Sequence, residues 1–211
     1  MLMTMKTKIP VLLLSLLWSA GYAQQTLQDE FLAALRANNT QIETIGCDFT
    51  QLKHNSLLAQ DAESSGKFYF KRPGKLALFY DEPAGDRVVM GETSFLIVAG
   101  GSRSVVKIAA NPFFLQMQQV FAACFSGDIA ALCSEGSFRC EKGPETYTVR
   151  ITPESKRARR YITELVLVFA SRDMLLNELR MTETSGNYTL YRFRNKQTNQ
   201  PVADSCFDCG K

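Results

Sequence analysis

Two consecutive segments decide the fold class: Gly66–Lys75 (GKFYFKRPGK) and Leu76–Tyr80 (LALFY). Successive side chains of a β-strand point to opposite faces, so apolar residues at alternate positions indicate a strand with one buried face. The Pro-Gly pair between the two apolar runs is typical of a turn, and the segments therefore predict a β-hairpin. The face that we expect to be shared holds Phe68, Phe70 and Arg72 on the first strand and Leu76, Leu78 and Tyr80 on the second.

Alternating patterns of the same kind continue on both sides of this hairpin. Loops rich in Gly, Pro, Ser and charged residues separate them. With the hairpin they make about eleven strands, and a twisted sheet of that size must curl or close. The further strands are expected at 45–51, 86–90, 93–99, 102–108, 137–141, 145–152, 161–170, 175–182 and 187–194.

Two helical regions interrupt the strands. Residues 26–38 carry an apolar stripe at helical spacing, and Thr26 suits the N-cap position. Asn111-Pro112 is typical of a second helix start, because Asn caps a helix well and Pro fits its first turn. This helix continues to about residue 125, and a short helix follows to about Cys133. The first stripe holds Leu27, Phe31, Leu32 and Leu35, and the second Phe113, Met117, Val120, Phe121 and Cys124.

These elements predict one domain over residues 24–211, mainly β with α. We expect a half-open, curved antiparallel sheet covered by an N-terminal helix and a mid-chain helical lid. Residues 1–23 are interpreted as a secretory signal peptide, with Lys6 and Lys8 before a short apolar run and small residues at Gly21 and Ala23. We therefore expect export from the cytoplasm, with cleavage near Ala23. The first cysteine of the chain is Cys47, so no lipid anchor is expected at the cleavage site.

Composition and cysteine spacing exclude several function classes. The formal net charge of +3 is too small for a dedicated nucleic-acid binder. His54 is the only histidine, no nucleophile elbow is present, and the cysteines lack zinc-finger spacing, so we expect no enzyme activity, no metal and no cofactor. Six cysteines in an exported chain favour disulfides. The candidates are Cys206 with Cys209, and a pairing among Cys124, Cys133 and Cys140.

The residues alone leave two readings of the apolar face open. A hydrophobic sheet face under hydrophobic helices is what an ordinary core looks like, but the helices are too few to cover so large a sheet. The alternative is a cavity for an apolar ligand. Its expected lining is Phe68, Phe70, Leu76, Leu78, Phe113, Phe114, Met117 and Phe121.

Motifs spread along the chain resemble those of a known family. They are Phe49-Thr50-Gln51, the run from Gly66 to Lys75, Pro83, Gly91, Tyr191–Asn195 (YRFRN) and Asn199-Gln200-Pro201. In this order and spacing they resemble the periplasmic outer-membrane lipoprotein carriers of the LolA type. The chain departs from that pattern at Leu78, where Trp is usual, and at Met90, where Asp is usual.

The resemblance implies an eleven-stranded half-barrel closed by helices, with an apolar cavity for lipoprotein acyl chains. It also implies that Arg72 helps to hold the helical lid shut. The partners it implies are an inner-membrane lipoprotein-releasing transporter and an outer-membrane acceptor, and we expect a monomer.

Two alternative functions stay open at this point. The scaffold could bind another amphiphile, such as a glycolipid or a pigment lipid. Cys206 and Cys209 form a C-x-x-C motif that could serve thiol–disulfide exchange, although only two residues follow it. The basic run 156–160 is either solvated or in contact with anionic head groups or an acidic partner.

Overall fold

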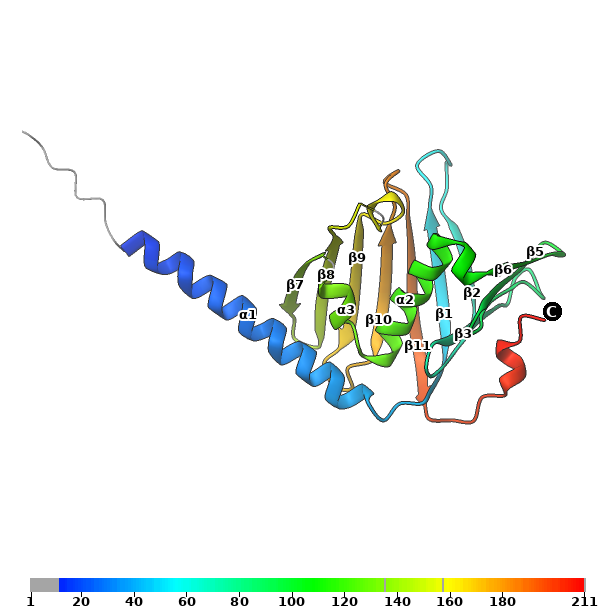
Figure 1. The fold of residues 1–211 in the computed structure, drawn as a ribbon, viewed down its shortest axis with the longest axis horizontal. Helices are drawn as coiled ribbons and strands as arrows, with labels where there is room; N and C mark the ends of the chain where they lie inside the picture. The colour runs from blue at the N-terminus through cyan, green and yellow to red at the C-terminus, as the bar shows by residue number, and fades with distance from the viewer. Residues whose placement is uncertain (1–11, 135, 157, 211) are drawn as a thin grey trace, which may run out of the picture.

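An eleven-stranded antiparallel sheet forms the body of the protein (Figure 1). The structure is a computed structural model that describes residues 12–134, 136–156 and 158–210. Neighbouring strands follow the order β6-β5-β4-β3-β2-β1-β11-β10-β9-β8-β7, so the first and last strands pair at the centre, and β6 and β7 form the edges. The bounds are β1 Thr44–His54, β2 Ala62–Lys71, β3 Lys75–Tyr80, β4 Arg87–Met90, β5 Ser94–Ala99, β6 Ser102–Lys107, β7 Gly136–Lys142, β8 Thr146–Pro153, β9 Glu164–Ala170, β10 Leu176–Thr182 and β11 Tyr188–Thr198. The expected open, mainly antiparallel sheet is confirmed.

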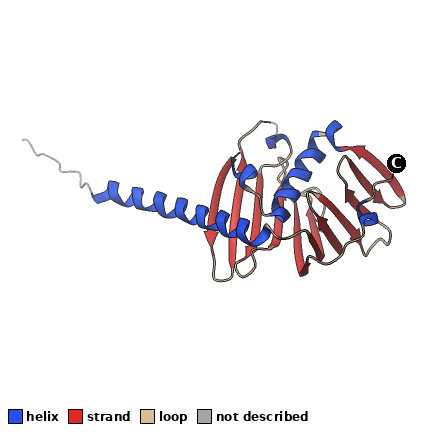
Figure 2. Ribbon diagram, turned by 60° about the horizontal axis from the view of Figure 1, so that its bottom comes forward, coloured by secondary structure: helices blue, strands red, loops and turns tan. Residues whose placement is uncertain are grey.

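In the part of the chain that the structure describes, three α-helices accompany the sheet. They are α1 Leu12–Asn39, α2 Pro112–Ser126 and α3 Ala130–Ser134, and short 3-10 helices lie at Ile108–Ala110, Ala158–Arg160 and Asp204–Phe207. Figure 2 shows the sheet bent into two halves, with α2 lying across its inner side. The main core lies between this inner face and the helices. Within the described part of the chain, no helix combines the length and hydropathy needed to cross a bilayer.

Helix α1 covers one edge of the sheet. Phe31 and Leu35 are fully buried, as the apolar stripe predicts. The side-chain amides of Gln24 and Gln28 donate to backbone carbonyls of Cys140 and Phe138 on β7. These bonds satisfy groups that an edge strand would otherwise leave open.

The expected start of α1 is wrong. The described residues are already helical from Leu12, so Thr26 lies within α1 and does not cap it. No Pro and no Gly-Pro pair separates the apolar run from the later helical stripe, so the two continue as one helix. Thr is tolerated inside a helix. The expected signal peptide lies partly in residues 1–11, outside the described residues.

The C-terminal segment gives the sheet a second, smaller core on its outer face. After β11 the chain runs back along β3 and β4 (Figure 1). There Phe207 and Cys209 pack with Ala77, Val89 and Leu96. The strands β3 to β5 are thereby covered on both faces, which explains their runs of buried residues.

Candidate ligand site: an apolar cavity beneath helix α2

A cavity of about 270 Å³ lies between α2 and the inner face of the sheet. Most of its walls are aliphatic, sulfur-containing or aromatic side chains. Such a lining with a few polar groups is typical of sites for apolar or amphiphilic small molecules. The lining residues are Gln51, Lys53, Leu76, Leu78, Tyr80, Val88, Met90, Phe95, Ile97, Phe113, Phe114, Met117, Phe121, Tyr161, Ile162, Met181, Glu183, Thr189 and Tyr191.

The N-terminal half of α2 forms the roof of this cavity. Phe114 stacks on Phe95 of β5 with 4.2 Å between ring centroids, and Phe113 meets Tyr161 at 5.6 Å. The Asn111 side chain caps the helix by accepting a bond from the Phe113 amide at 3.0 Å, as the sequence predicts. The side chains of residues 113–118 are only half-buried. The roof therefore rests on a few ring contacts and leaves part of its apolar surface exposed.

The C-terminal half of α2 is packed firmly against the sheet. Phe125 stacks on Phe68 at 4.5 Å and on Phe70 at 5.8 Å, and meets Phe193 edge-on at 5.1 Å. Phe68 and Phe70 are fully buried in this cluster. One helix therefore has a fixed end, embedded in aromatic rings, and a lightly held end over the cavity.

Arg72 ties the fixed end of α2 to the end of α1. Its guanidinium donates to the carbonyls of Ile42 at 2.5 Å, Asn39 at 2.8 Å and Ser126 at 2.9 Å. Asn39 and Ser126 are the last residues of α1 and α2. The carbonyls at a helix C-terminus lack intrahelical partners and carry partial negative charge, so a cation there is favourable. A planar group with several donors can serve three carbonyls at once.

Six of the eight residues expected to line a cavity do so in the structure: Leu76, Leu78, Phe113, Phe114, Met117 and Phe121. Phe68 and Phe70 lie on the expected face but outside the cavity lining, because Phe125 covers them. Sequence reasoning missed the walls from β4, β5 and β10 and the polar residues of the cavity. Tyr80 could have been found, since it alternates with Leu76 and Leu78 on one strand.

A chain of three hydrogen-bonded side chains forms the polar part of the wall. The Tyr80 hydroxyl donates to Gln51 Oε1 at 3.2 Å, and Gln51 Nε2 donates to the Tyr191 hydroxyl at 2.6 Å. Gln51 and Tyr191 face each other directly across β1 and β11. Burial raises the pKa of Tyr191 well above its usual range and also raises the pKa of Tyr80. Both phenols are therefore neutral at physiological pH.

Gly66 allows β3 to approach β2 where Tyr80 is held. It pairs with Tyr80 in the strand register. A Cβ atom at Gly66 would lie 1.9 Å from the carbonyl oxygen of Phe79, so no larger residue fits without moving the strand. The glycine of the Gly66–Lys75 motif thus helps to place the tyrosine that begins the polar chain.

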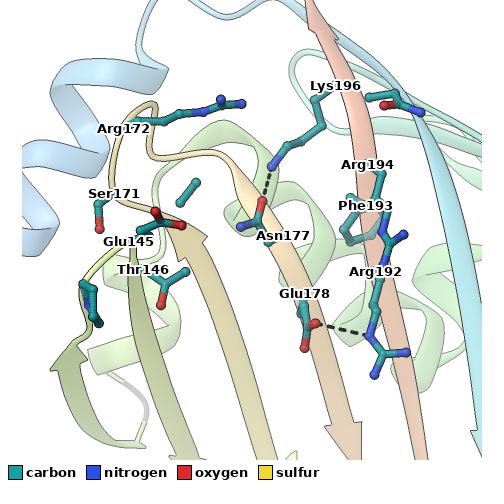
Figure 3. A pocket seen from close by; sticks show the side chains of 13 residues that line it. Glu145, Thr146, Ser171, Arg172, Asn177, Glu178, Arg192, Phe193, Arg194 and Lys196 are labelled. Atoms are coloured by element: carbon teal, nitrogen blue, oxygen red, sulfur yellow. Dashed lines mark hydrogen bonds and ion pairs between the residues drawn. The ribbon is translucent and has the colours of Figure 1, made fainter.

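A larger depression, of about 900 Å³, lies on the outer face of the sheet (Figure 3). Arg192 and Arg194 alternate along β11 with the buried Tyr191 and Phe193, and so point away from the cavity. The Arg192 Nε lies 3.2 Å from a carboxylate oxygen of Glu178. The depression is lined largely by charged and amide groups. An apolar chain placed there would leave those groups desolvated, so the smaller inner cavity fits an apolar ligand better.

The six cysteines are free thiols in the structure, so the expected disulfides stay a prediction. Cys206 and Cys209 flank the end of a four-residue 3-10 helix, and burial raises the pKa of Cys209. A redox-active thiol needs the opposite shift, which a helix N-terminus or a nearby cation usually provides. Among the described residues, no group of three or more His, Cys, Asp or Glu side chains could hold a metal ion.

The family model of the outer membrane lipoprotein carrier protein LolA matches residues 40–209. The chain belongs to the LolA family. The match covers every strand and the helices α2 and α3, hence the whole of the cavity. A comparison with curated proteins finds no match for this LolA-family chain.

Solved structures share the fold at low sequence identity. A crystal structure of MucB superposes with a TM-score of 0.51 at 13% identity, over 86% of this chain and 62% of that one. The Pseudomonas aeruginosa MucA/MucB complex gives 0.50 at 13% identity, over 86% and 60%. An uncharacterized conserved protein from Thermus thermophilus gives 0.50 at 9% identity, over 85% and 91%. This LolA-family chain thus spans about three fifths of the MucB chains, and the likeness concerns the fold alone.

Proposed function

We propose that this protein is a non-enzymatic periplasmic carrier that holds the acyl chains of lipoproteins, or of a related lipid, in the cavity beneath α2. The observation that carries the proposal is an apolar cavity, in a LolA-family fold, roofed by a half-buried stretch of helix. The supported ligand class is an acyl chain, because the walls offer apolar area and few charges.

The energetics of lipid transfer explain why such a carrier is needed. Exposing one methylene group to water costs about 0.8 kcal/mol, so a chain of about 14 methylenes costs on the order of 11 kcal/mol. A lipidated protein therefore does not cross an aqueous compartment unaided at a useful rate. A carrier must cover much of this area and still release it.

The cavity has properties that suit transient holding. Its volume of about 270 Å³ lies just below the usual range for ligand sites, so a long chain requires the roof to lift. Met117 in the roof and Met90 and Met181 in the walls are flexible and can repack around chains of different shape. In this proposal the carrier loads at an inner-membrane lipoprotein-releasing transporter and unloads at an outer-membrane acceptor.

A vesicle assay tests the proposal. Donor vesicles carrying a synthetic diacylated lipopeptide are mixed with the protein comprising residues 24–211, and lipopeptide in the vesicle-free fraction is measured. The wild-type protein should move lipopeptide into that fraction. Phe114→Asp should reduce the amount at least tenfold, because a carboxylate cannot be buried against an acyl chain. Val105→Asp, on the exposed strand β6, is the control and should behave as wild type. Equal amounts with Phe114→Asp and wild type would contradict the proposal.

A further inference from the structure

The polar chain Tyr80–Gln51–Tyr191 in the cavity wall leaves two donors unused, the second N–H of the Gln51 amide and the hydroxyl proton of Tyr191. Gln51 accepts a bond from Tyr80 through its amide oxygen and donates to Tyr191 through its amide nitrogen. The Tyr191 hydroxyl oxygen therefore accepts, and its own proton is still to be donated. Among the described residues, this proton has no acceptor. A buried donor without a partner is costly, by about 1 to 3 kcal/mol.

The position of this donor points to a ligand group. Tyr191 is only 6% exposed, and it lines the apolar cavity together with Gln51 and Tyr80. Its ring is fixed by contacts with Phe121 at 5.6 Å and Phe193 at 6.2 Å. The hydroxyl is therefore held in place and faces a space that an acyl chain is proposed to fill.

The strand register orders the groups along the cavity. Lys53 lies two residues beyond Gln51 on β1, toward the end of the strand, and pairs with Thr189 of β11. In the other direction along the wall come Tyr80, then Leu78 and Leu76, at spacings of about 7 Å for every two residues. A ligand with its polar end at Tyr191 would therefore extend its alkyl chain under α2.

We propose that Tyr191 donates a hydrogen bond to the carbonyl oxygen of a neutral acyl ester or amide, and that the cavity selects carbonyl-linked chains over plain hydrocarbon chains. The inference rests on the proposed carrier function and names its ligand class. A neutral carbonyl fits better than a carboxylate, because the three polar groups at this depth are uncharged and the nearest lining cation, Lys53, is exposed at the rim.

The test compares two lipids that differ only in the carbonyl. A diacyl phospholipid and its dialkyl ether analogue, with equal chains and head group, are titrated against wild type, Tyr191→Phe and Tyr80→Phe. Wild type should bind the ester lipid about three- to tenfold more tightly, the range expected for one neutral hydrogen bond. Tyr191→Phe should bind the two lipids equally. Tyr80→Phe should keep the preference, because the Tyr191 proton is still present.

The outcomes separate this inference from the carrier function. If wild type binds ester and ether lipids equally, or if Tyr191→Phe keeps the preference while its thermal melting is unchanged, the inference is wrong and the carrier function stands. If wild type binds neither lipid, both are wrong. A preference lost in Tyr80→Phe but kept in Tyr191→Phe would also overturn the assignment of the donor.

Discussion

The guanidinium of Arg72 donates to the carbonyl of Ser126, the last residue of α2, at a distance of 2.9 Å. The bond joins the turn after β2 to the helix that roofs the cavity. The same guanidinium holds two carbonyls near the end of α1. The N-terminal half of α2 forms the roof over the cavity. Arg72 therefore holds the opposite, C-terminal end of the helix, where a hinge for lifting the roof would lie. The lid-locking role implied by the family resemblance can act through this anchor.

Replacing Arg72 tests the anchor. Arg72→Leu should lower the free energy of unfolding by about 2 to 4 kcal/mol. The loss is smaller than the sum of three charged hydrogen bonds, because the three carbonyls are only partly buried and water can replace part of what the guanidinium donates. Arg72→Lys should recover less than half, because an ammonium group lacks the planar fork. Urea unfolding measures both. Lys71→Leu is a matched control, since its partner Asp204 is exposed, and should change stability by less than about 1 kcal/mol.

The same variants should alter the lid. Without the anchor, amide hydrogens in residues 120–126 should exchange faster, and an acyl probe should leave the cavity faster. Hydrogen exchange and stopped-flow probe release follow the two changes. Unchanged exchange and release in a folded Arg72→Leu protein would make Arg72 a stabilising residue at a turn and nothing more.

Cys133 lies between two possible disulfide partners. Burial raises the pKa of Cys124, and the neighbouring Cys133 raises it further. Burial likewise raises the pKa of Cys133 to about 12, with a smaller contribution from Cys140. We expect peptide mapping without reductant, on protein from an oxidising compartment, to find Cys133 linked to Cys124 or Cys140. Closing so short a loop should stabilise the fold by about 2 to 3 kcal/mol. Three free thiols in that sample would contradict the prediction.

Cys47 should make stability fall at alkaline pH. Burial raises its pKa from 9.0 to about 12 in the folded protein. Below pH 9 the Cys47 thiol is protonated in both the folded and the unfolded state, so its contribution to the free energy of unfolding is complete. As the pH rises from 9 toward 12 the unfolded chain ionises first and stability is lost. At pH 10 the loss is about 1.4 kcal/mol for this one thiol. Cys47→Val should show a smaller decline between pH 8 and 10, and an identical decline in urea unfolding would show that Cys47 does not titrate this way.

The C-terminal cysteines should not catalyse disulfide exchange. Cys209 is buried against the carbonyl of Ser94, with 3.2 Å between sulfur and oxygen, and its pKa is raised by burial. A thiol protonated at neutral pH is a poor nucleophile. An insulin-reduction assay should give the rate of the buffer alone. Turnover that disappears in Cys206→Ser would revive the redox alternative.

Alternation along strands made most of the fold predictable. The hairpin of Gly66–Tyr80 and the cap at Asn111 follow from rules that need only neighbouring residues. The extent of α1 does not follow from such rules, because a long apolar run continues into the stripe of Phe31 and Leu35 without a break. The packing of the C-terminal segment on the outer face was also not predictable from local patterns, since Phe207 is more than a hundred residues away in sequence from the residues of β3 and β4 that it contacts.

The sequence predicts which face of the sheet bears the candidate site, but not which side chains of that face border the cavity. Phe68 and Phe70 have the same pattern as Leu76 and Leu78, yet Phe125 of α2 covers only the first pair. Which side chains remain uncovered depends on where the helix crosses the sheet, and periodicity carries no such information. The bond between Gln51 and Tyr191 joins positions 140 residues apart and depends on the β1–β11 register.

Photo-cross-linking with a diacylated lipopeptide that carries a diazirine in one chain tests the carrier claim most directly. Labelled peptides are mapped by mass spectrometry after irradiation of the loaded protein. We predict labels on residues 113–121 of α2 and on β3 to β5, which face the cavity, and competition by unlabelled lipopeptide. Labels on Arg192 and Arg194 in the outer depression, or labelling no greater than in urea-unfolded protein, would contradict an acyl site beneath α2.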